Sequence, residues 1–305
     1  RQWQERLQAF LGVGKGLVGT IGGGKAKPTG KVDIAVMQSL SRQGSVDALV
    51  ENYGQVIVDE CHHVGAVSFD AILKRVKAKF VVGLTATPIR RDGQQPIIFM
   101  QCGPIRHKVA ASEGAPHDLE VLPRMSYRQI DVAPDAGIQV VFRHLADDAE
   151  RTGTIAAKVI DAFARGRKIL VLTERTEHLE ALVASLVGRI PSPFVLHGRM
   201  SKKQRAALIA QLADLPPQAP RVLLATGKLV GEGFDHPPLD TLVLAMPISW
   251  KGTLQQYAGR LHREHASKTD VRIIDFVDTG HPALLRMWEK RQLGYRAMGY
   301  RVAST

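Results

Sequence analysis

The sequence is poor in cysteine and contains no long apolar segment. Its two cysteines, Cys61 and Cys102, cannot form the disulfide framework of a small secreted protein, and such low usage is typical of a reducing compartment. No run of about 18 apolar residues occurs, so we expect no segment that crosses a membrane, and no secretory signal pattern is present. These absences predict a cytoplasmic protein.

Aromatic residues are also few, at 6%, but the hydrophobic content of 45% over 305 residues suffices for about two buried cores. Lys and Arg number 41 against 29 Asp and Glu, which gives a formal net charge of +12. Both halves of the chain carry part of this surplus. It favours a polyanionic partner, most simply nucleic acid, and a protein that is merely basic is the alternative that charge leaves open.

Short apolar runs alternate with amphipathic helical patterns along most of the chain. This alternation predicts an α/β fold with two domains, each built on a parallel sheet. We expect the first domain at residues 1–112, a connector at 113–138 that includes one strand near 124–132, and the second domain at 139–305. The predicted strands are 17–22, 33–38, 55–60 and 80–86 in the first domain, and 168–173, 194–198, 221–226, 241–247 and 271–277 in the second.

The stretch QVIVDECHH, residues 55–63, places two carboxylates directly after a predicted buried strand. Ligands of open α/β sheets bind at the carboxyl edge of the strands. There Asp59 can hold Mg²⁺, and Glu60 can orient or deprotonate an attacking water, which suits nucleoside triphosphate hydrolysis. A zinc site is the alternative, but the adjacent side chains of residues 61–63 cannot readily all bind one ion. A Cys61 nucleophile is a further alternative, and nothing in the sequence marks its partner base.

Three more motifs follow DECH in a fixed order: TATP at 85–88, GEGFD at 231–235 and QYAGRLHR at 256–263. In this order the chain resembles a superfamily 2 helicase of the DExH type, with these stretches as motifs II, III, V and VI. The segment 2–11 is similar to the region around motif Ia, and VLHGRMS, 195–201, to the turn after motif IV. The branch it resembles contains XPB, UvsW and the type III restriction Res subunit. Two stretches are similar to helicase modules of primase-associated conflict-system proteins, IGGGKAKPTGKVDIAVMQSL and IIFMQCGPIRHKV.

The resemblance implies two tandem RecA-like domains that bind ATP and Mg²⁺ and act on nucleic acid, DNA rather than RNA. It implies that Asp59 holds Mg²⁺, that Glu60 is the catalytic base, and that Arg260 and Arg263 are arginine fingers. An arginine finger accelerates phosphoryl transfer by about 10³–10⁵. The alternative is that both arginines are solvated charges on the surface of a helix. Four further residues are implied to lie at the nucleotide or at the interface between the domains: Gln256, His62, Gly233 and Asp235. Thr85 and Thr87 are implied to couple ATP hydrolysis to the grip on the nucleic-acid strand.

Polar and basic side chains in both domains are the predicted contacts to nucleic acid. Arg199 is the strongest candidate, because backbone N–H groups at the helix start that follows it would face the same phosphate. A solvated surface charge is the alternative for any single member. The predicted contacts are Gln38, Arg90, Arg199, Lys202 and Lys203.

A phosphate-binding loop of the pattern GxxxxGK[ST] is missing from the sequence. Residues 19–26, GTIGGGKA, have Gly19, Gly24 and Lys25 at the required spacing, but Ala26 replaces the hydroxyl residue that would hold Mg²⁺. This stretch and GVGKG, 12–16, both follow the motif Ia region instead of preceding it, so neither is accepted as the loop. We therefore expect a first domain without its Walker A strand and helix. We also expect a fragment of a longer protein, with further domains upstream and impaired ATP hydrolysis in isolation.

The expected activity is that of an ATP-dependent DNA helicase or translocase, a nucleoside triphosphatase. One alternative is an ATPase-deficient basic DNA-binding module, against which the intact Asp59, Glu60, Arg260 and Arg263 argue. The other is the motor subunit of a restriction enzyme. Since no PD-(D/E)xK nuclease pattern occurs, that alternative needs a nuclease on another domain.

Overall fold

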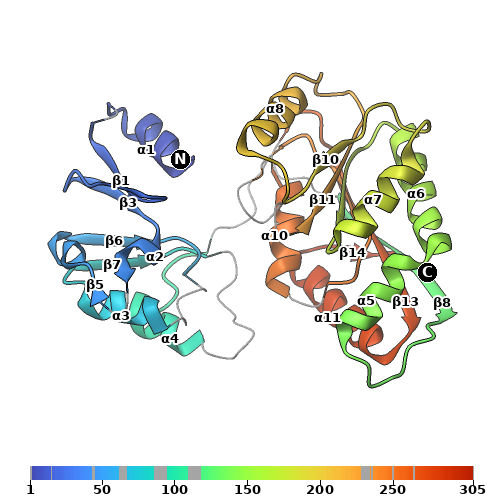
Figure 1. Cartoon of the computed structure of the whole chain (residues 1–305), viewed down its shortest axis with the longest axis horizontal. Helices are drawn as coiled ribbons and strands as arrows, with labels where there is room; N and C mark the ends of the chain where they lie inside the picture. Colours follow the sequence, from blue (N-terminus) through green and yellow to red (C-terminus); the bar gives the residue numbers. More distant parts are fainter. Residues whose placement is uncertain are drawn as a thin grey trace. The chain divides into compact units, whose positions relative to one another are not determined.

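The computed structural model describes residues 2–14, 16–42, 45–61, 67–85, 95–108, 118–227, 234, 236–248, 251–263 and 265–304. The chain divides into two compact units, Arg1–Val109 and Ala110–Thr305 (Figure 1). Both units are α/β structures, as the alternation of apolar runs and helical patterns predicts. None of the helices in the described part is long and apolar enough to cross a membrane.

The first unit opens with α1 (Gln2–Leu11) and a small sheet of strand order β2-β1-β3. Gly23 and Gly24, both at positive φ, close an antiparallel hairpin between β1 and β2. The stretch GTIGGGKA therefore joins two antiparallel strands, whereas a phosphate-binding loop joins a strand to a helix. The strands and short elements of this part are β1 (Val18–Gly22), β2 (Lys25–Lys27), β3 (Val32–Ala35), α2 (Met37–Leu40), β4 (Ser41–Arg42), β5 (Ser45–Val46) and the 3₁₀ helix η1 (Ala48–Asn52).

A second, parallel pair of strands carries the DECH stretch. This pair consists of β6 (Gln55–Val58) and β7 (Phe80–Gly83), and helices α3 (Val67–Arg75) and α4 (Gln95–Cys102) cover one of its faces. On the other face the side chains of Ile57 and Phe80 are 57% and 56% exposed. Parallel sheets are normally covered on both faces. In the described part of this unit, only one face of the pair is covered.

The second unit is built on a seven-stranded parallel sheet of order β10-β11-β9-β12-β13-β8-β14 (Figure 1). The central strands β9 and β12 are buried along their whole length, which explains their continuous apolar sequences. The strands are β8 (Asp118–Gln129), β9 (Lys168–Thr173), β10 (Phe194–Leu196), β11 (Arg221–Thr226), β12 (Thr241–Leu244), β13 (Asp270–Gly280) and β14 (Arg301–Val302).

Strand β8 lies inside the segment 113–138, which the sequence predicts to be a connector with one strand near 124–132. It pairs with β13 over most of its length, and Val121 is completely buried. Pro123 lies within this strand, where proline is normally excluded because it cannot donate to a ladder. β14 pairs with β8 only at Glu120 and Val121, so among the described strands Pro123 has a ladder partner on one side alone. A strand with one free side tolerates proline.

Helices cover both faces of this sheet. One apolar cluster packs α6 and α7 against it, and the other packs α8, α10 and α11. A capping box between Ser201 and Gln204 begins α8, and the aromatic side chains of Trp288, Tyr295 and Tyr300 are buried in the core. The helices are α5 (Ile138–Asp147), α6 (Ala149–Ala164), α7 (Thr176–Leu186), α8 (Lys202–Ala213), α10 (Lys251–Leu261) and α11 (Pro282–Ala297).

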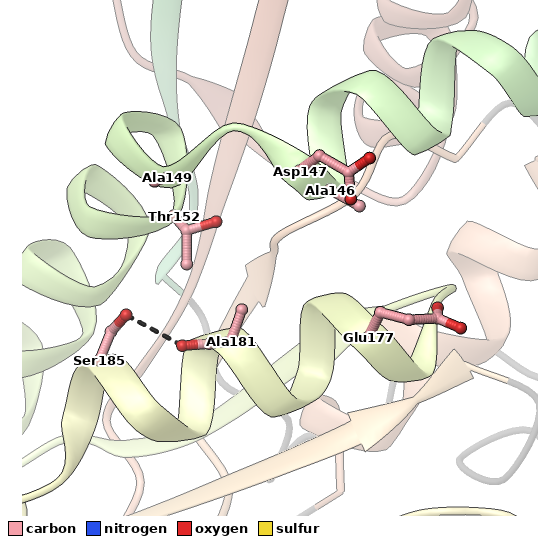
Figure 2. Close-up of a pocket in the computed structure, with 7 residues that line it drawn as sticks. All are labelled: Ala146, Asp147, Ala149, Thr152, Glu177, Ala181 and Ser185. Atoms are coloured by element: carbon pink, nitrogen blue, oxygen red, sulfur yellow. Dashed lines mark hydrogen bonds between the residues drawn. The ribbon is translucent and has the colours of Figure 1, made fainter.

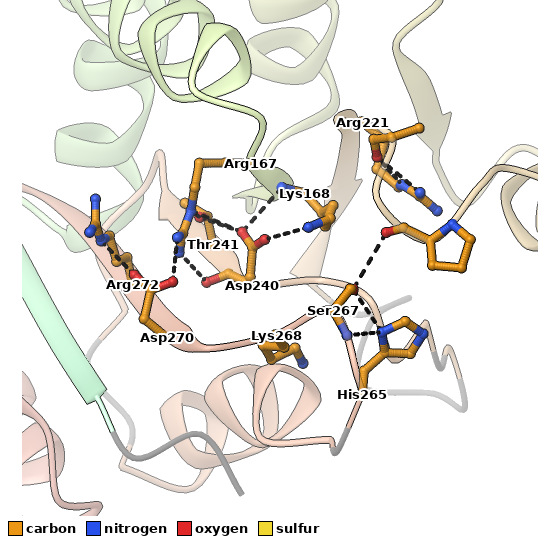
Figure 3. A network of polar contacts seen from close by, with 12 residues as sticks. Arg167, Lys168, Arg221, Asp240, Thr241, His265, Ser267, Lys268, Asp270 and Arg272 are labelled. Atoms are coloured by element: carbon orange, nitrogen blue, oxygen red, sulfur yellow. Dashed lines mark hydrogen bonds and ion pairs between the residues drawn. The ribbon is translucent and has the colours of Figure 1, made fainter.

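A network of ion pairs closes the amino edge of the sheet, where β9, β12 and β13 begin (Figure 3). Arg167 reaches Asp240 at 3.1 Å and Asp270 at 2.5 Å, and Lys168 reaches the other oxygen of Asp240 at 3.4 Å. These side chains are largely buried, so each charge is compensated inside the protein. Helix α10, which carries QYAGRLHR, follows the opposite, carboxyl end of β12.

Candidate functional site

The turn after β6 holds both predicted carboxylates. Asp59 is exposed, and its carboxylate accepts the Glu60 N–H at 3.0 Å and the Trp3 indole N–H at 2.8 Å. Glu60 has a backbone φ of 50°, in the left-handed region that residues other than glycine rarely adopt. The chain then returns to the sheet, where the Cys61 N–H donates to the Leu84 carbonyl at 2.9 Å. The turn is therefore held by α1 on one side and by the end of β7 on the other.

The same contacts bring the start of TATP beside this turn. The Leu84 N–H donates to the Val58 carbonyl at 2.8 Å, which extends the β6–β7 pairing beyond the last strand residues. Thr85 follows at once and is half-buried. Strand register thus places Thr85 next to the two carboxylates, as the order of the motifs predicts for the carboxyl edge of a sheet.

Helix α10 carries the motif predicted to supply the arginines. Four of its residues at helical spacing, Leu254, Tyr257, Ala258 and Leu261, are buried in the core. This stripe leaves Gln256 and Arg260, four residues apart, together on another face, and both are half-buried. Arg263 follows the helix and is exposed.

The carboxyl end of α10 is fixed by a lysine and a histidine. The Lys268 Nζ donates to the carbonyls of Leu261 and Arg263 at 2.7 and 2.8 Å, where a cation also complements the helix dipole. His262 hydrogen-bonds the Tyr300 hydroxyl at 2.8 Å and stacks on its ring. These contacts hold the main chain of Arg263 to the rest of the unit.

A contact at the carboxyl edge joins three segments that sequence reasoning did not connect. The Tyr257 hydroxyl on α10 donates to the Glu174 carboxylate, directly after β9, at 3.5 Å. Gly227, directly after β11, packs against both groups, since a Cβ there would lie 2.1 Å from the Tyr257 oxygen. Burial raises the pKa of Glu174 and that of Tyr257. The chain order switches sides of the sheet here, between β9 and β12, and ligands of α/β sheets bind at such points.

Several predicted residues lie elsewhere or outside the described residues. Arg199 is exposed and forms an ion pair with Glu180 at 3.6 Å, Lys203 is exposed in the first turn of α8, and Gln38 is exposed on α2. Lys202 begins α8, but its side chain is not described. His62, Thr87, Arg90, Gly233 and Asp235 lie outside the described residues.

A hollow of 310 Å³ opens in the second unit between α7 and the junction of α5 with α6 (Figure 2). Asp147 and Glu177 stand at one end of it, and Thr152 and Ser185 line the rest with three alanines. The Ser185 hydroxyl donates to the Ala181 carbonyl at 2.9 Å. Of the predicted functional residues that the structure describes, none lines this hollow.

Comparison with known families assigns both parts of the chain. Residues 1–90 match the family described as "Type III restriction enzyme, res subunit", and residues 154–265 match "Helicase conserved C-terminal domain". A solved structure of Dbp5 from S. cerevisiae, bound to RNA and ADP BeF3, has the same fold, with a TM-score of 0.64 and 15% identity. The superposition covers 99% of this chain and 74% of that one. The fold is therefore that of tandem RecA-like helicase domains.

Curated proteins of similar sequence agree with this assignment. "Probable helicase D10" of Escherichia phage T5 is 24% identical over 303 residues, which cover 98% of this chain and 64% of D10. "DNA 3'-5' translocase XPB2" of Sulfurisphaera tokodaii is 30% identical over 112 residues, 37% of this chain and 24% of XPB2. The chain belongs to the DExH-type helicases of superfamily 2. It spans 52% and 64% of the lengths of two viral relatives.

Proposed function

We propose that this chain is the part of an ATP-dependent DNA helicase or translocase that couples ATP hydrolysis to movement on nucleic acid. The observation that carries the proposal is the placement of the motif residues in each unit. Asp59 and Glu60 directly follow β6, with Thr85 beside them, while Gln256 and Arg260 share one face of α10. Asp59, Glu60 and Thr85 lie where α/β sheets bind ligands, at the carboxyl ends of parallel strands.

The first unit would supply the metal ligand and the base. The exposed carboxylate of Asp59 is a suitable oxygen ligand for Mg²⁺, which binds proteins through one or two carboxylates and takes the rest of its shell from phosphates and water. The ion would neutralise charge on the β- and γ-phosphates. The unusual backbone of Glu60 directs its side chain from a tight turn, as expected of a group that must orient one water molecule.

The second unit would supply positive charge. Arg260, and Arg263 beyond the helix end, would neutralise the oxygens of the phosphoryl group as it transfers. Gln256, one turn before Arg260, would contact the nucleotide side of the first unit. This chemistry requires that the guanidinium groups are held in fixed positions. The buried residues of α10 and the contacts of Lys268 with the end of the helix support that role, because they fix the helix in the second unit.

We propose DNA as the nucleic acid and the cytoplasm as the compartment. The net charge of +12 supports a nucleic-acid partner, and Arg199 and Lys203 are exposed near the start of α8, where phosphates bind favourably. The name of the XPB2 relative specifies DNA, although Dbp5 was solved with RNA. Gln38 and the Arg90 and Lys202 side chains are further proposed contacts.

The phosphate-binding loop is the component of this machinery that the sequence pattern does not provide. We infer that residues upstream of this chain supply it in the full-length protein, since the chain covers 52% and 64% of two relatives. Gly233, Asp235, His62 and Thr87 keep their proposed roles from the motifs.

DNA-stimulated ATP hydrolysis tests the proposal, measured for this chain and for the protein extended upstream through its loop. We expect turnover only in the extended protein, and we expect Glu60→Gln to lower it by about 10²–10⁴ while ATP binding is retained. Glu51→Gln, on η1, is the control, and it should leave turnover unchanged. DNA binding without turnover in either protein would instead favour the ATPase-deficient binding module.

The match to the Res subunit family favours one variant of this function, the motor of a restriction enzyme. It predicts that the extended protein translocates on DNA without separating the strands. Displacement of a triplex-forming strand, compared with unwinding of a forked duplex, distinguishes the two. Unwinding of the fork by the protein alone would speak for a helicase.

A further inference from the structure

The two cysteines of the sequence lie 41 positions apart, at 61 and 102, yet they meet in the core of the first unit. Cys61 follows the Asp59–Glu60 turn and is 3% exposed, and Cys102 ends α4 and is half-buried. Both are free thiols, and both belong to the same apolar cluster. With only two cysteines in 305 residues, their contact is not a consequence of abundance.

A glycine makes room for this contact. A Cβ at Gly83, the last residue of β7, would lie 2.9 Å from the Cys61 Sγ and 3.1 Å from the Cys102 Sγ. Both sulfurs therefore rest against the bare Cα of Gly83. The hydrogen bond from the Cys61 N–H to the Leu84 carbonyl fixes the main chain beside the pair. The end of β7 thus positions both sulfurs against one another.

We propose that Cys61 and Cys102 form a redox-sensitive modification site, which a peroxide converts into an intrachain disulfide. The Cys102 thiolate attacks one peroxide oxygen, the O–O bond breaks, and water leaves after protonation, so that Cys102 becomes a sulfenic acid. The Cys61 sulfur then attacks the Cys102 sulfur, the S–O bond breaks, and a second water leaves. Two thiols and one hydrogen peroxide give one disulfide and two waters, with two electrons passing from sulfur to oxygen.

The surroundings of the two sulfurs assign these roles. Cys102 is the more accessible, so it meets the oxidant first. The neighbouring Cys61 thiol lowers the pKa of Cys102, which favours the reactive thiolate. Cys61 is buried and already in contact with the Cys102 sulfur, as a resolving cysteine must be. Disulfides inside reducing compartments are mostly transient and regulatory, which matches a reversible pair of this kind.

The expected consequence rests on the proposed function. A disulfide would tie the turn that carries Asp59 and Glu60 to the end of α4. Helix α4 is itself joined to α3, since the Gln101 amide donates to Asp70 at 2.6 Å. The oxidised turn could then adjust less to a bound nucleotide, and we expect ATP turnover to fall about tenfold.

Intact mass and peptide mapping after treatment of this chain with hydrogen peroxide test the covalent step directly. We expect the loss of two hydrogens, a peptide that links Cys61 to Cys102, and recovery of both thiols with a dithiol reductant. Cys61→Ser should retain a sulfenic acid on Cys102 that dimedone traps, and Gly83→Ala should slow disulfide formation because its Cβ separates the sulfurs. Persistence of both free thiols, or conversion of Cys102 to a sulfinic acid in the wild type, would overturn the proposal.

The regulatory consequence has its own readout in the extended protein. Peroxide should lower ATP turnover of the wild type and leave that of Cys102→Ala unchanged, and the reductant should restore the wild type. A disulfide that forms without a change in turnover would overturn the regulatory role. Absence of turnover in the reduced protein counts against the proposed function, because mass spectrometry detects the disulfide independently of activity.

Discussion

The Trp3 indole N–H donates to the Asp59 carboxylate at 2.8 Å, a contact between residues 56 positions apart. Trp3 lies on α1 and is 43% exposed, so the hydrogen bond lies at the surface of the first unit. Asp59 is the proposed Mg²⁺ ligand, and the oxygen that accepts from Trp3 is one of its two possible donors to the metal. The indole and the ion therefore compete for this carboxylate.

Replacing Trp3 with Phe removes the donor and keeps an aromatic side chain. An exposed hydrogen bond to a charged group is worth up to about 1 kcal/mol, or about fivefold in affinity. We expect Trp3→Phe to lower the Mg²⁺ concentration for half-maximal ATP hydrolysis in the extended protein by about two- to fivefold. Gln4→Ala, which removes the contact of α1 with the Val18 carbonyl, should not change it. A higher requirement for Mg²⁺ in Trp3→Phe would contradict this explanation.

The contact of Gly227 with Tyr257 predicts a second outcome. A Cβ at Gly227 would lie 2.1 Å from the Tyr257 oxygen and 2.7 Å from a Glu174 oxygen, so Tyr257 must shift. Overpacking of this kind costs about 1–3 kcal/mol, and we expect Gly227→Ala to destabilise the protein by that amount in urea unfolding. Tyr257→Phe, which removes the hydroxyl, should recover part of the loss in the double variant. At Gly259 on α10 a Cβ meets nothing within 4 Å, so Gly259→Ala serves as the control and should be neutral or stabilising.

His178 on α7 predicts a pH dependence of stability. Burial, with the nearby charge of Arg151, lowers its pKa from 6.5 to about 4, and the Thr173 hydroxyl hydrogen-bonds its Nδ1 at 2.9 Å. The unfolded chain takes up a proton near pH 6.5, but the folded chain does so only near pH 4. The neutral ring therefore contributes stability that is complete above pH 6.5 and is lost as the pH falls towards 4, on the order of 3 kcal/mol at most.

His178→Asn removes this titration, so the free energy of unfolding should depend less on pH between 6.5 and 4 than in the wild type. Urea unfolding followed by far-ultraviolet circular dichroism measures the difference. His144→Asn, on α5, is the control and should keep the wild-type dependence. Equal pH dependence in His178→Asn and the wild type would exclude His178 as the titrating group.

Arg260 predicts a loss of turnover with little loss of binding. Since its charge is needed when the phosphoryl group transfers, Arg260→Ala should lower kcat in the extended protein by about 10³ and change ATP affinity by only a few-fold. Gln255→Ala, at a neighbouring half-buried position of α10, should lower kcat by much less. A similar loss in both variants would indicate that α10 is merely disturbed.

The buried strands could be predicted from sequence because central parallel strands are continuous apolar runs. The predicted strand 168–173 coincides with β9, and the predicted strand 55–60 contains β6. The predicted strand 33–38 is too long, because β3 ends at Ala35 and α2 begins at Met37. The strand predicted near 124–132 overlaps β8, but β8 begins earlier, at Asp118. Its first half was missed because it leads into Pro123, which is tolerated there because the neighbouring β14 ends early.

Only the residues of the candidate site that lie within the sequence motifs could be predicted. The order of motifs indicated Asp59, Glu60 and Arg260, and strand register then explains why Thr85 lies beside the first two. No periodicity encodes the contact of Trp3 with Asp59, which depends on how α1 packs. Glu174 offered a usable signal, because it is a carboxylate directly after a buried strand, as Asp59 is.

The pairing of β8 with β13 has a mechanical consequence. Strand β8 begins at Asp118, so it is the first described element of the second unit, and its pairing with β13 extends from Asp118 to Gln129. A pull on the amino end of β8 along its axis would load these hydrogen bonds in shear, all at once, whereas a hairpin pulled apart breaks them one after another. The second unit should therefore resist force applied through β8, because its hydrogen bonds to β13 do not break one after another.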